Sequence, residues 1–229
     1  MISEKTVELN LTTELVNWNF HITGTRPYIL APSQRQEGKL GFDVSIGYPG
    51  SNPTLIQYKR AYHKKRKGEL EFHLNRNTNQ DQHLRLFILE LLGHDVFYAL
   101  PLFYQPSDVI RFRRRLLVRT LFLKPSWIIP VGGLTGHHEI KYNLKTKKLT
   151  VFSEEGKEID RFFDFFDFAR EVELRLLDRQ RGENRIERFL TDFNNVFAGP
   201  EGFRYEEFRI GPVSEQEQNL TDSMNVLIN

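Results

Sequence analysis

Residues 40–60, LGFDVSIGYPGSNPTLIQYKR, contain two apolar segments joined by a cluster of turn-forming residues. Residues 41–46 alternate apolar and polar side chains, which is the period-two pattern of a β-strand. Residues 54–59 are rich in aliphatic and aromatic side chains, and the YPGSNP segment before them is typical of a chain reversal. The stretch predicts a β-hairpin, and we expect the rest of the fold to be organised around it.

Three polar side chains lie at one end of this predicted hairpin. Asp43 belongs to the first strand, and Gln57 and Lys59 belong to the second. Gln57 and Lys59 are two residues apart, so both side chains leave the same face of their strand. A carboxylate, an amide oxygen and an ammonium group that converge there can hold a divalent cation and a water molecule. The pattern predicts phosphodiester hydrolysis, and a solvated cross-strand pair of Asp43 and Lys59 is the structural alternative.

The segment before the hairpin allows two interpretations. A strand over residues 6–11 followed by a short helix over 12–18 fits the alternation of apolar residues. One helix over residues 3–17 fits the apolar residues that recur at spacing four. In either case, residues 28–31 predict a strand that leads into the hairpin.

The segment after the hairpin predicts a crossover between parallel strands. A basic turn at 63–68 precedes a strand at 69–74, a helix at 81–92 and a nearly continuous apolar strand at 95–103. A helix followed by a buried strand implies that part of the sheet is parallel. We expect Gly93 to end this helix and its buried stripe to consist of Leu84, Phe87, Ile88 and Leu91.

The remaining pattern alternates short extended segments with helices. It predicts a helix that opens at residue 106, extended segments at 120–123 and 127–131, a hairpin from 138–144 and 148–152, and helices over 162–177 and 186–197. The fold class is therefore α/β, with a mixed central sheet flanked by helices and a helical C-terminal extension. We divide the chain into an α/β domain at 1–131, a hairpin with helices at 132–213 and a flexible tail at 214–229.

The composition limits the environment and the partners. The 229 residues include no cysteine, which excludes disulfides and thiolate metal sites and is typical of a reducing compartment. No signal pattern and no apolar run of about 20 residues is found, so we expect a cytoplasmic protein outside the membrane. Residues 1–152 hold 22 Lys and Arg against 12 Asp and Glu, a net +10, whereas residues 153–229 hold 10 against 18, a net −8. This asymmetry indicates a polyanionic partner for the first part.

GFD at residues 41–43 and QYK at 57–59 form the D…(E/Q)xK pattern. In these residues the chain resembles the PD-(D/E)xK nuclease superfamily, which has the restriction-endonuclease-like fold, in the Gln variant of Mrr-like enzymes. The expected order of elements over roughly residues 12–105 agrees with the resemblance. It implies a metal-dependent nuclease, acting on DNA in host defence or nucleic-acid processing, with Mg²⁺ or Mn²⁺ as cofactor.

The resemblance also implies a role for each residue of the motif. Asp43 would bind the metal, Gln57 would offer a neutral oxygen where most members have Glu, and Lys59 would orient or activate the attacking water. A further acid is expected at the metal, and Glu14 and Glu37 are the two candidates. Because Gln57 lowers the charge of the site by one, an inactive nucleic-acid-binding or assembly module is the alternative function.

Two basic clusters are candidates for contact with nucleic-acid phosphates. The first follows the hairpin directly and contains Lys64, Lys65, Arg66 and Lys67. The second contains Arg111, Arg113, Arg114 and Arg115. The C-terminal helices offer a surface for a homodimer or a partner protein. His137 and His138 are adjacent on a predicted strand and would point to opposite faces, so we do not expect them to chelate a metal together.

Overall fold

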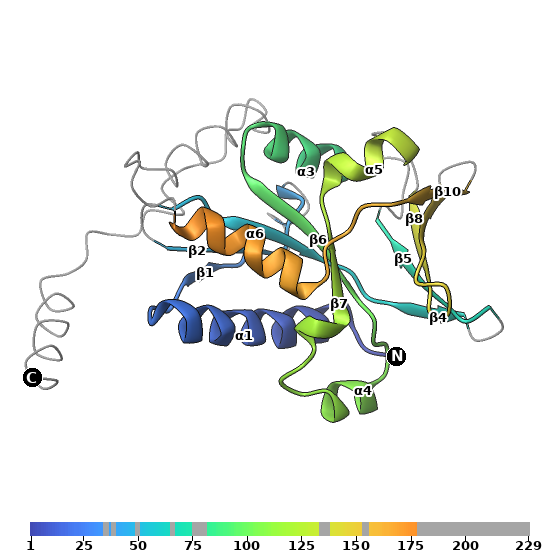
Figure 1. Cartoon of the computed structure of the whole chain (residues 1–229), viewed down its shortest axis with the longest axis horizontal. Helices are drawn as coiled ribbons and strands as arrows, with labels where there is room; N and C mark the ends of the chain where they lie inside the picture. The colour runs from blue at the N-terminus through green and yellow to red at the C-terminus, as the bar shows by residue number, and fades with distance from the viewer. Residues whose placement is uncertain are drawn as a thin grey trace, which may run out of the picture.

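The computed structural model describes residues 1–33, 37, 40–48, 51–64, 67–74, 82–132, 138–152 and 156–177. The helix expected at 186–197 and the tail expected at 214–229 lie outside these residues. The described chain forms two β-sheets with helices packed around the first (Figure 1).

A single long helix opens the chain. α1 runs from Glu4 to Thr23, so the single-helix interpretation is correct and the strand at residues 6–11 is not formed. The Ser3 side chain accepts a hydrogen bond from the Thr6 N–H and caps the helix, and Gly24 ends it with a φ of 68°. Val7, Leu11 and Leu15 are buried, as their spacing of four residues predicts for one helix face.

The first sheet is mixed and has the order β1-β2-β3-β6-β7 within the described chain. Its strands are β1 (Tyr28–Leu30), β2 (Val44–Gly47), β3 (Thr54–Tyr58), β6 (Asp95–Pro101) and β7 (Thr120–Leu123). β2 and β3 form the predicted antiparallel hairpin, and β3 pairs with β6 in parallel. All seven residues of β6 are buried, which explains its continuous apolar sequence.

The crossover from β3 to β6 contains two strands as well as the expected helix. α3 (Gln82–Leu91) is that helix, but its buried residues are His83, Leu86 and Leu89 rather than the predicted stripe. Leu91 of the predicted stripe is 68% exposed. The prediction of the face was wrong because apolar residues occur nearly all round this helix, so their spacing does not select one side.

A second sheet, of order β10-β9-β8-β5-β4 in the described chain, is entirely antiparallel. Its strands are β4 (Tyr62–Lys64), β5 (Glu69–His73), β8 (Glu139–Asn143), β9 (Leu149–Phe152) and β10 (Gly156–Ile159). The hairpin β8–β9 confirms the sequence prediction. β4 was predicted as part of a basic turn, and β10 had no prediction. The β5–β8 pairing joins residues on either side of the predicted boundary at 131, and that boundary stays a prediction.

Four further elements are α4 (Pro106–Arg111), the 3₁₀ turn η1 (Leu117–Arg119), α5 (Pro125–Gly132) and α6 (Phe165–Leu177). The extended segment predicted at 127–131 is wrong, because this segment is helical in α5. Glu90 of α3 accepts hydrogen bonds from the backbone N–H of Ser126 at 2.8 Å and from its hydroxyl at 2.6 Å. A tertiary cap therefore overrides the β-propensity of Trp127, Ile128 and Ile129.

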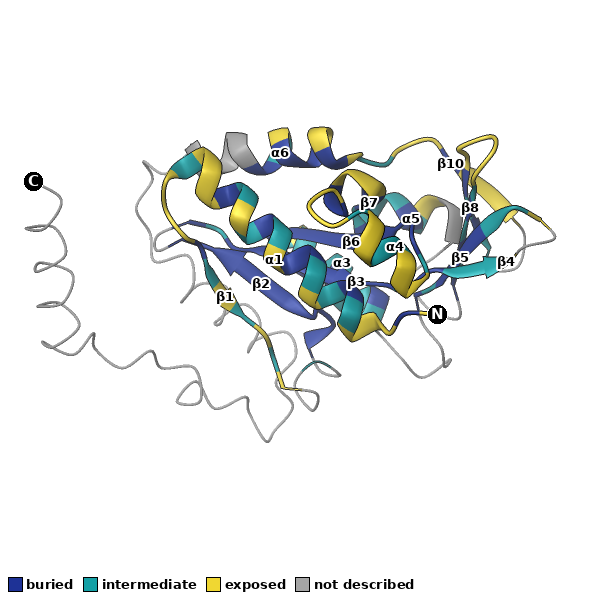
Figure 2. Ribbon diagram, turned by 90° about the horizontal axis from the view of Figure 1, so that it is seen from below, coloured by how far each residue is buried: buried dark blue, intermediate teal, exposed yellow. Residues whose placement is uncertain are grey.

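The first sheet separates two apolar cores. One core joins α1 and α6 to one face of the sheet, with Leu11, Ile56 and Phe168 as examples. The other joins α3, α5 and the second sheet, with Leu86, Leu55 and Phe72 as examples. Figure 2 shows the central strands buried and the outer faces of α1 and α4 exposed. Among the described residues, no helix combines the length and apolar character needed to cross a membrane.

Candidate functional site

The β2–β3 hairpin brings Asp43, Gln57 and Lys59 to the same end of the first sheet. Asp43 lies one residue before β2, and its N–H donates to the Ile56 carbonyl at 3.0 Å. Gln57 is the fourth residue of β3, and Lys59 follows the strand, with its N–H donating to the Ala99 carbonyl of β6 at 3.0 Å. The register of three neighbouring strands therefore fixes the backbone positions of all three residues.

The side chains of Asp43 and Gln57 are joined directly. The Gln57 Nε2 donates to Asp43 Oδ2 at 3.0 Å, and the Tyr58 backbone N–H donates to the same oxygen at 2.7 Å. Asp43 is 8% exposed, Gln57 3% and Lys59 5%. The Lys59 ammonium acts on Asp43 and opposes the rise in its pKa. The three residues are a buried polar cluster and not solvated strand residues.

Glu37 adds a second carboxyl group to this cluster. It lies in a helical turn in which the Gly41 N–H donates to the Glu37 carbonyl at 2.8 Å. Burial raises the pKa of Asp43 well above its ordinary value, and a hydrogen bond with the Glu37 side chain raises it further. The structure therefore brings the Glu37 side chain to the Asp43 carboxyl group.

Gln82, the first residue of α3, orients Lys59. The Lys59 Nζ donates to Gln82 Oε1 at 2.9 Å, and Gln82 Nε2 donates to the Gly41 carbonyl at 3.2 Å. Gly41 has a φ of 84°, which favours glycine, and a Cβ there would lie 3.4 Å from the Gln82 carbonyl oxygen. The beginning of α3 is thereby tied to both strands of the hairpin. The link from Gln82 to Lys59 depends on the tertiary structure.

The first half of α1 also faces the cluster. The Thr12 hydroxyl donates to the Tyr58 hydroxyl at 3.0 Å. Lys5 donates to Glu8 at 2.6 Å; the pKa of Lys5 is raised first by Glu8 and also by the charges of Asp43 and Glu37. Sequence reasoning missed Lys5 and Glu8. Their position on the same face of α1 as Thr12 would have indicated them once the single helix was chosen.

Glu14 lies elsewhere. Its Oε2 accepts a hydrogen bond at 2.9 Å from the N–H of Leu116, just before η1. Burial raises the pKa of Glu14. Of the two acids that the sequence offered, the structure brings Glu37 to Asp43 and turns Glu14 toward another loop.

The cluster fits a hard divalent cation. Gln57 Oε1 is buried and has no hydrogen-bond partner among the described residues. The other end of the same amide donates to the Asp43 carboxyl group, which Glu37 approaches in turn. Carboxylate and amide oxygens are the donors that Mg²⁺ and Mn²⁺ prefer. Asp43, Glu37 and Gln57 are therefore the residues that could hold such an ion, with Lys59 next to it.

The basic clusters are only partly described. Lys64 lies at the end of β4 with its Nζ 3.3 Å from Glu71 Oε1, and Lys67 is exposed in the following turn. Lys65 and Arg66 lie outside the described residues. The second cluster, consisting of Arg111, Arg113, Arg114 and Arg115, is exposed at the end of α4 and in the turn after it. This segment packs through Val109 and Phe112 against the core on the α1 side of the sheet.

Only one of the two adjacent histidines falls within the part of the chain that the structure describes. His137 lies outside the described residues, and His138 is fully buried with its ring 5.5 Å from that of His83.

The comparisons with known proteins were negative: no family model, no curated protein and no solved structure matches this chain. Its function is therefore inferred from its own geometry.

Proposed function

We propose that the protein is a metal-dependent nuclease that hydrolyses phosphodiester bonds, with DNA as its substrate and a restriction-endonuclease-like fold. The single observation that carries this proposal is the buried cluster of Asp43, Gln57 and Lys59 at one end of the hairpin. Buried polar groups are usually hydrogen-bonded, whereas Gln57 Oε1 has no partner among the described residues. A buried amide oxygen left in this way supports a cation-binding role for the cluster.

The order of the elements supports the same proposal. A helix precedes an antiparallel hairpin that carries the D…QxK residues, and a helical crossover leads to a buried parallel strand. This is the arrangement that the resemblance to PD-(D/E)xK nucleases implies. The insertion of β4 and β5 within the crossover leaves the position of the hairpin beside α1, α3 and β6 intact.

Each residue then has a chemical role. Asp43, Glu37 and Gln57 would hold Mg²⁺ or Mn²⁺. Such an ion, when bound, lowers the pKa of a coordinated water and stabilises the charge that develops on the phosphate. Lys59, fixed by its hydrogen bond to Gln82, orients the attacking water and offsets negative charge on the phosphate. The exposed lysines and arginines hold the flanking phosphates without reading the bases.

A nucleic-acid-binding module without catalysis is the second candidate. Two observations favour it: Gln57 supplies no charge, and Asp43 is nearly covered by protein, which raises the pKa of its carboxyl group. Both features weaken metal binding relative to a site with three carboxylates. In this case the basic clusters would bind nucleic acid while the hairpin cluster served only to stabilise the fold.

Incubation of the protein with plasmid, linear and single-stranded DNA in Mg²⁺, Mn²⁺ or chelator separates the two functions. We expect cleavage that requires a metal and falls about a hundredfold or more in Lys59→Ala, since one positioned catalytic group commonly contributes that much. Arg60→Ala, at the next residue, is the matched control and should cleave normally. Cleavage by Lys59→Ala at the wild-type rate would contradict the proposed nuclease site. DNA binding without cleavage in any metal supports the binding module.

A further inference from the structure

A second group of metal-ligating side chains lies on the second sheet. Glu71 and His73 are two residues apart on β5 and so share one face, and Glu139 of β8 is the direct register partner of His73. Each of the three offers one ligand atom, and these atoms lie within 4.8 Å of one another. The antiparallel register thus assembles one imidazole and two carboxylates on a single sheet face.

We propose that Glu71, His73 and Glu139 bind a divalent first-row transition metal, of which Zn²⁺ is the representative. The imidazole nitrogen separates this site from the all-oxygen cluster at Asp43, because Mg²⁺ and Ca²⁺ take oxygen ligands whereas imidazole suits zinc and its neighbours. Zn²⁺ holds nitrogen and carboxylate oxygen at about 2.0–2.2 Å, which places tetrahedral ligands about 3.4 Å apart. The three ligand atoms, which lie within 4.8 Å of one another in the metal-free protein, would approach to this separation when the ion binds.

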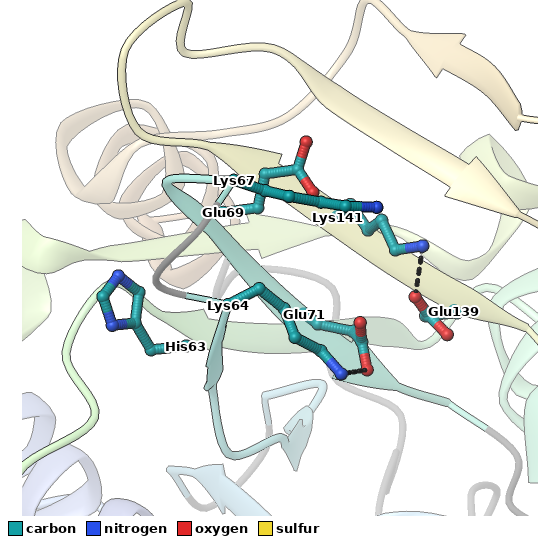
Figure 3. A pocket seen from close by; sticks show the side chains of 7 residues that line it. All are labelled: His63, Lys64, Lys67, Glu69, Glu71, Glu139 and Lys141. Atoms are coloured by element: carbon teal, nitrogen blue, oxygen red, sulfur yellow. Dashed lines mark ion pairs between the residues drawn. The ribbon is translucent and has the colours of Figure 1, made fainter.

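Two lysines hold the carboxylates in the metal-free protein. Figure 3 shows Lys64 of β4 paired with Glu71 of β5, and Lys141 paired with Glu139 on the same strand, β8. The N–O distances are 3.3 Å for the first pair and 2.7 Å for the second. The buried Glu71 carboxylate requires a cationic partner. An ammonium group and a metal ion compete for the same oxygens, so the lysines are the groups that Zn²⁺ would displace.

The surroundings of the cluster suit this exchange. Lys64 has a side chain that is 51% exposed and can swing away into solvent. The His73 imidazole is held by Glu71, 3.2 Å from its Nε2, and by an edge-on contact with the Tyr62 ring at 4.8 Å. These contacts restrain His73 next to its proposed co-ligand Glu71 in the metal-free protein.

The site opens to solvent. An open pocket of about 700 Å³ is lined by Glu71, Glu139, both lysines and three neighbours, His63, Lys67 and Glu69. Three protein ligands with an open fourth position characterise catalytic rather than structural zinc sites. The pocket provides room for a water molecule or an anionic ligand at that position, and Lys67 would favour the anion.

Calorimetric titration of Zn²⁺, Mn²⁺ and Mg²⁺ into the untagged full chain tests the proposal. We expect one Zn²⁺ per chain at this site and an affinity at least tenfold lower in His73→Ala and in Glu139→Gln. Two matched controls should bind as the wild type does: His21→Ala removes an exposed histidine of α1, and Glu69→Gln removes a carboxylate from the same pocket outside the cluster. Asp43→Asn should keep Zn²⁺ binding at Glu71, His73 and Glu139, because the cluster at Asp43 is a separate site.

Replacing a lysine provides a second test, in which the Zn²⁺ affinity should rise instead of falling. Lys141→Met removes the competitor for Glu139, so Zn²⁺ binding should become severalfold tighter. Circular dichroism at the titration temperature verifies that each variant is folded. Equal Zn²⁺ affinity in the wild type and the folded His73→Ala and Glu139→Gln variants would overturn the proposal. So would weaker binding in Lys141→Met, because the lysine would then belong to the bound state.

Discussion

Gln57 is the residue on which the chemistry of the hairpin cluster depends. Its Nε2 donates to Asp43 Oδ2, so a Glu at this position would set two carboxylates against each other. We expect Gln57→Glu to bind Mn²⁺ about tenfold or more tightly than the wild type, because a divalent cation relieves the added negative charge. The metal-free variant should also melt at a lower temperature, and Mn²⁺ should restore it.

Calorimetry and thermal melting with and without Mn²⁺ measure both effects. Gln105→Glu, which adds the same charge at the exposed N-cap of α4, serves as the control and should change neither quantity. Identical Mn²⁺ affinity in Gln57→Glu and the wild type would contradict a metal role for this position.

His83 makes a separate prediction about pH. Burial, together with the nearby His138, lowers its pKa from 6.5 to about 3. Because the pKa of the folded state lies below that of the unfolded state, the full stability of the protein is present above pH 6.5. Stability is lost increasingly as the pH falls toward 3. The free energy of unfolding should therefore decrease by up to about 1.4 kcal/mol per pH unit in this window.

Urea unfolding at pH 7, 6 and 5 measures this dependence. His83→Gln keeps a polar partner for the Tyr98 hydroxyl, 3.1 Å from His83 Nδ1, but cannot be protonated. Its stability should depend less steeply on pH than that of the wild type, whereas His21→Gln, at an exposed position, should keep the full slope. An unchanged slope in His83→Gln would show that other groups cause the acid sensitivity.

At the scale of elements, the basic turn between β4 and β5 is the segment that we propose contacts nucleic-acid phosphates. Each lysine or arginine that contacts a phosphate releases about one counterion. Replacing Lys64, Lys65, Arg66 and Lys67 by alanine should flatten the log–log salt dependence of DNA binding by up to about 3 units. We expect 3 rather than 4 because Lys64 is already paired with Glu71.

Affinity measurements at several salt concentrations, on two unrelated DNA sequences, test this prediction. The loss should be similar for both sequences, since phosphate contacts carry no base information. A variant of the arginines at 111–115 is the comparison, because that segment packs on the α1 side of the sheet. A salt slope equal to that of the wild type in the 64–67 variant would mean that the turn is only solvated.

At the scale of the whole molecule, the two sheets share one core. Phe72 of β5 is fully buried in the same apolar cluster as Leu55 and Tyr98 of the first sheet. Phe72→Ala should therefore lower the free energy of unfolding by about 3–5 kcal/mol and weaken both sheets together. Phe166→Ala, at a site that is 63% exposed, is the matched control and should cost little.

Denaturant unfolding measures the total loss, and hydrogen exchange locates it. We expect faster exchange in β6 as well as in β5, because opening of the shared core exposes both. Exchange that accelerates in the second sheet while β6 keeps its protection would show that the two sheets unfold as separate units.

The sequence by itself determined those features that depend on local pattern. The turn formers between residues 48 and 53 and the alternation around them defined the β2–β3 hairpin, and the apolar run at 95–101 defined a strand buried on both faces. The two-residue spacing of Gln57 and Lys59 placed both on one strand face. The structure has these features as predicted, because local backbone geometry alone fixes them.

The tertiary structure decided everything that depends on residues distant in the chain. The pairing of β5 with β8, the burial of His83 rather than Leu91 on α3, and the helix over residues 125–132 each require a partner from another segment. The same holds at the hairpin cluster, where Glu37 and not Glu14 meets Asp43, and Gln82 holds Lys59. A sequence pattern lists which groups are present, whereas packing selects which of them meet.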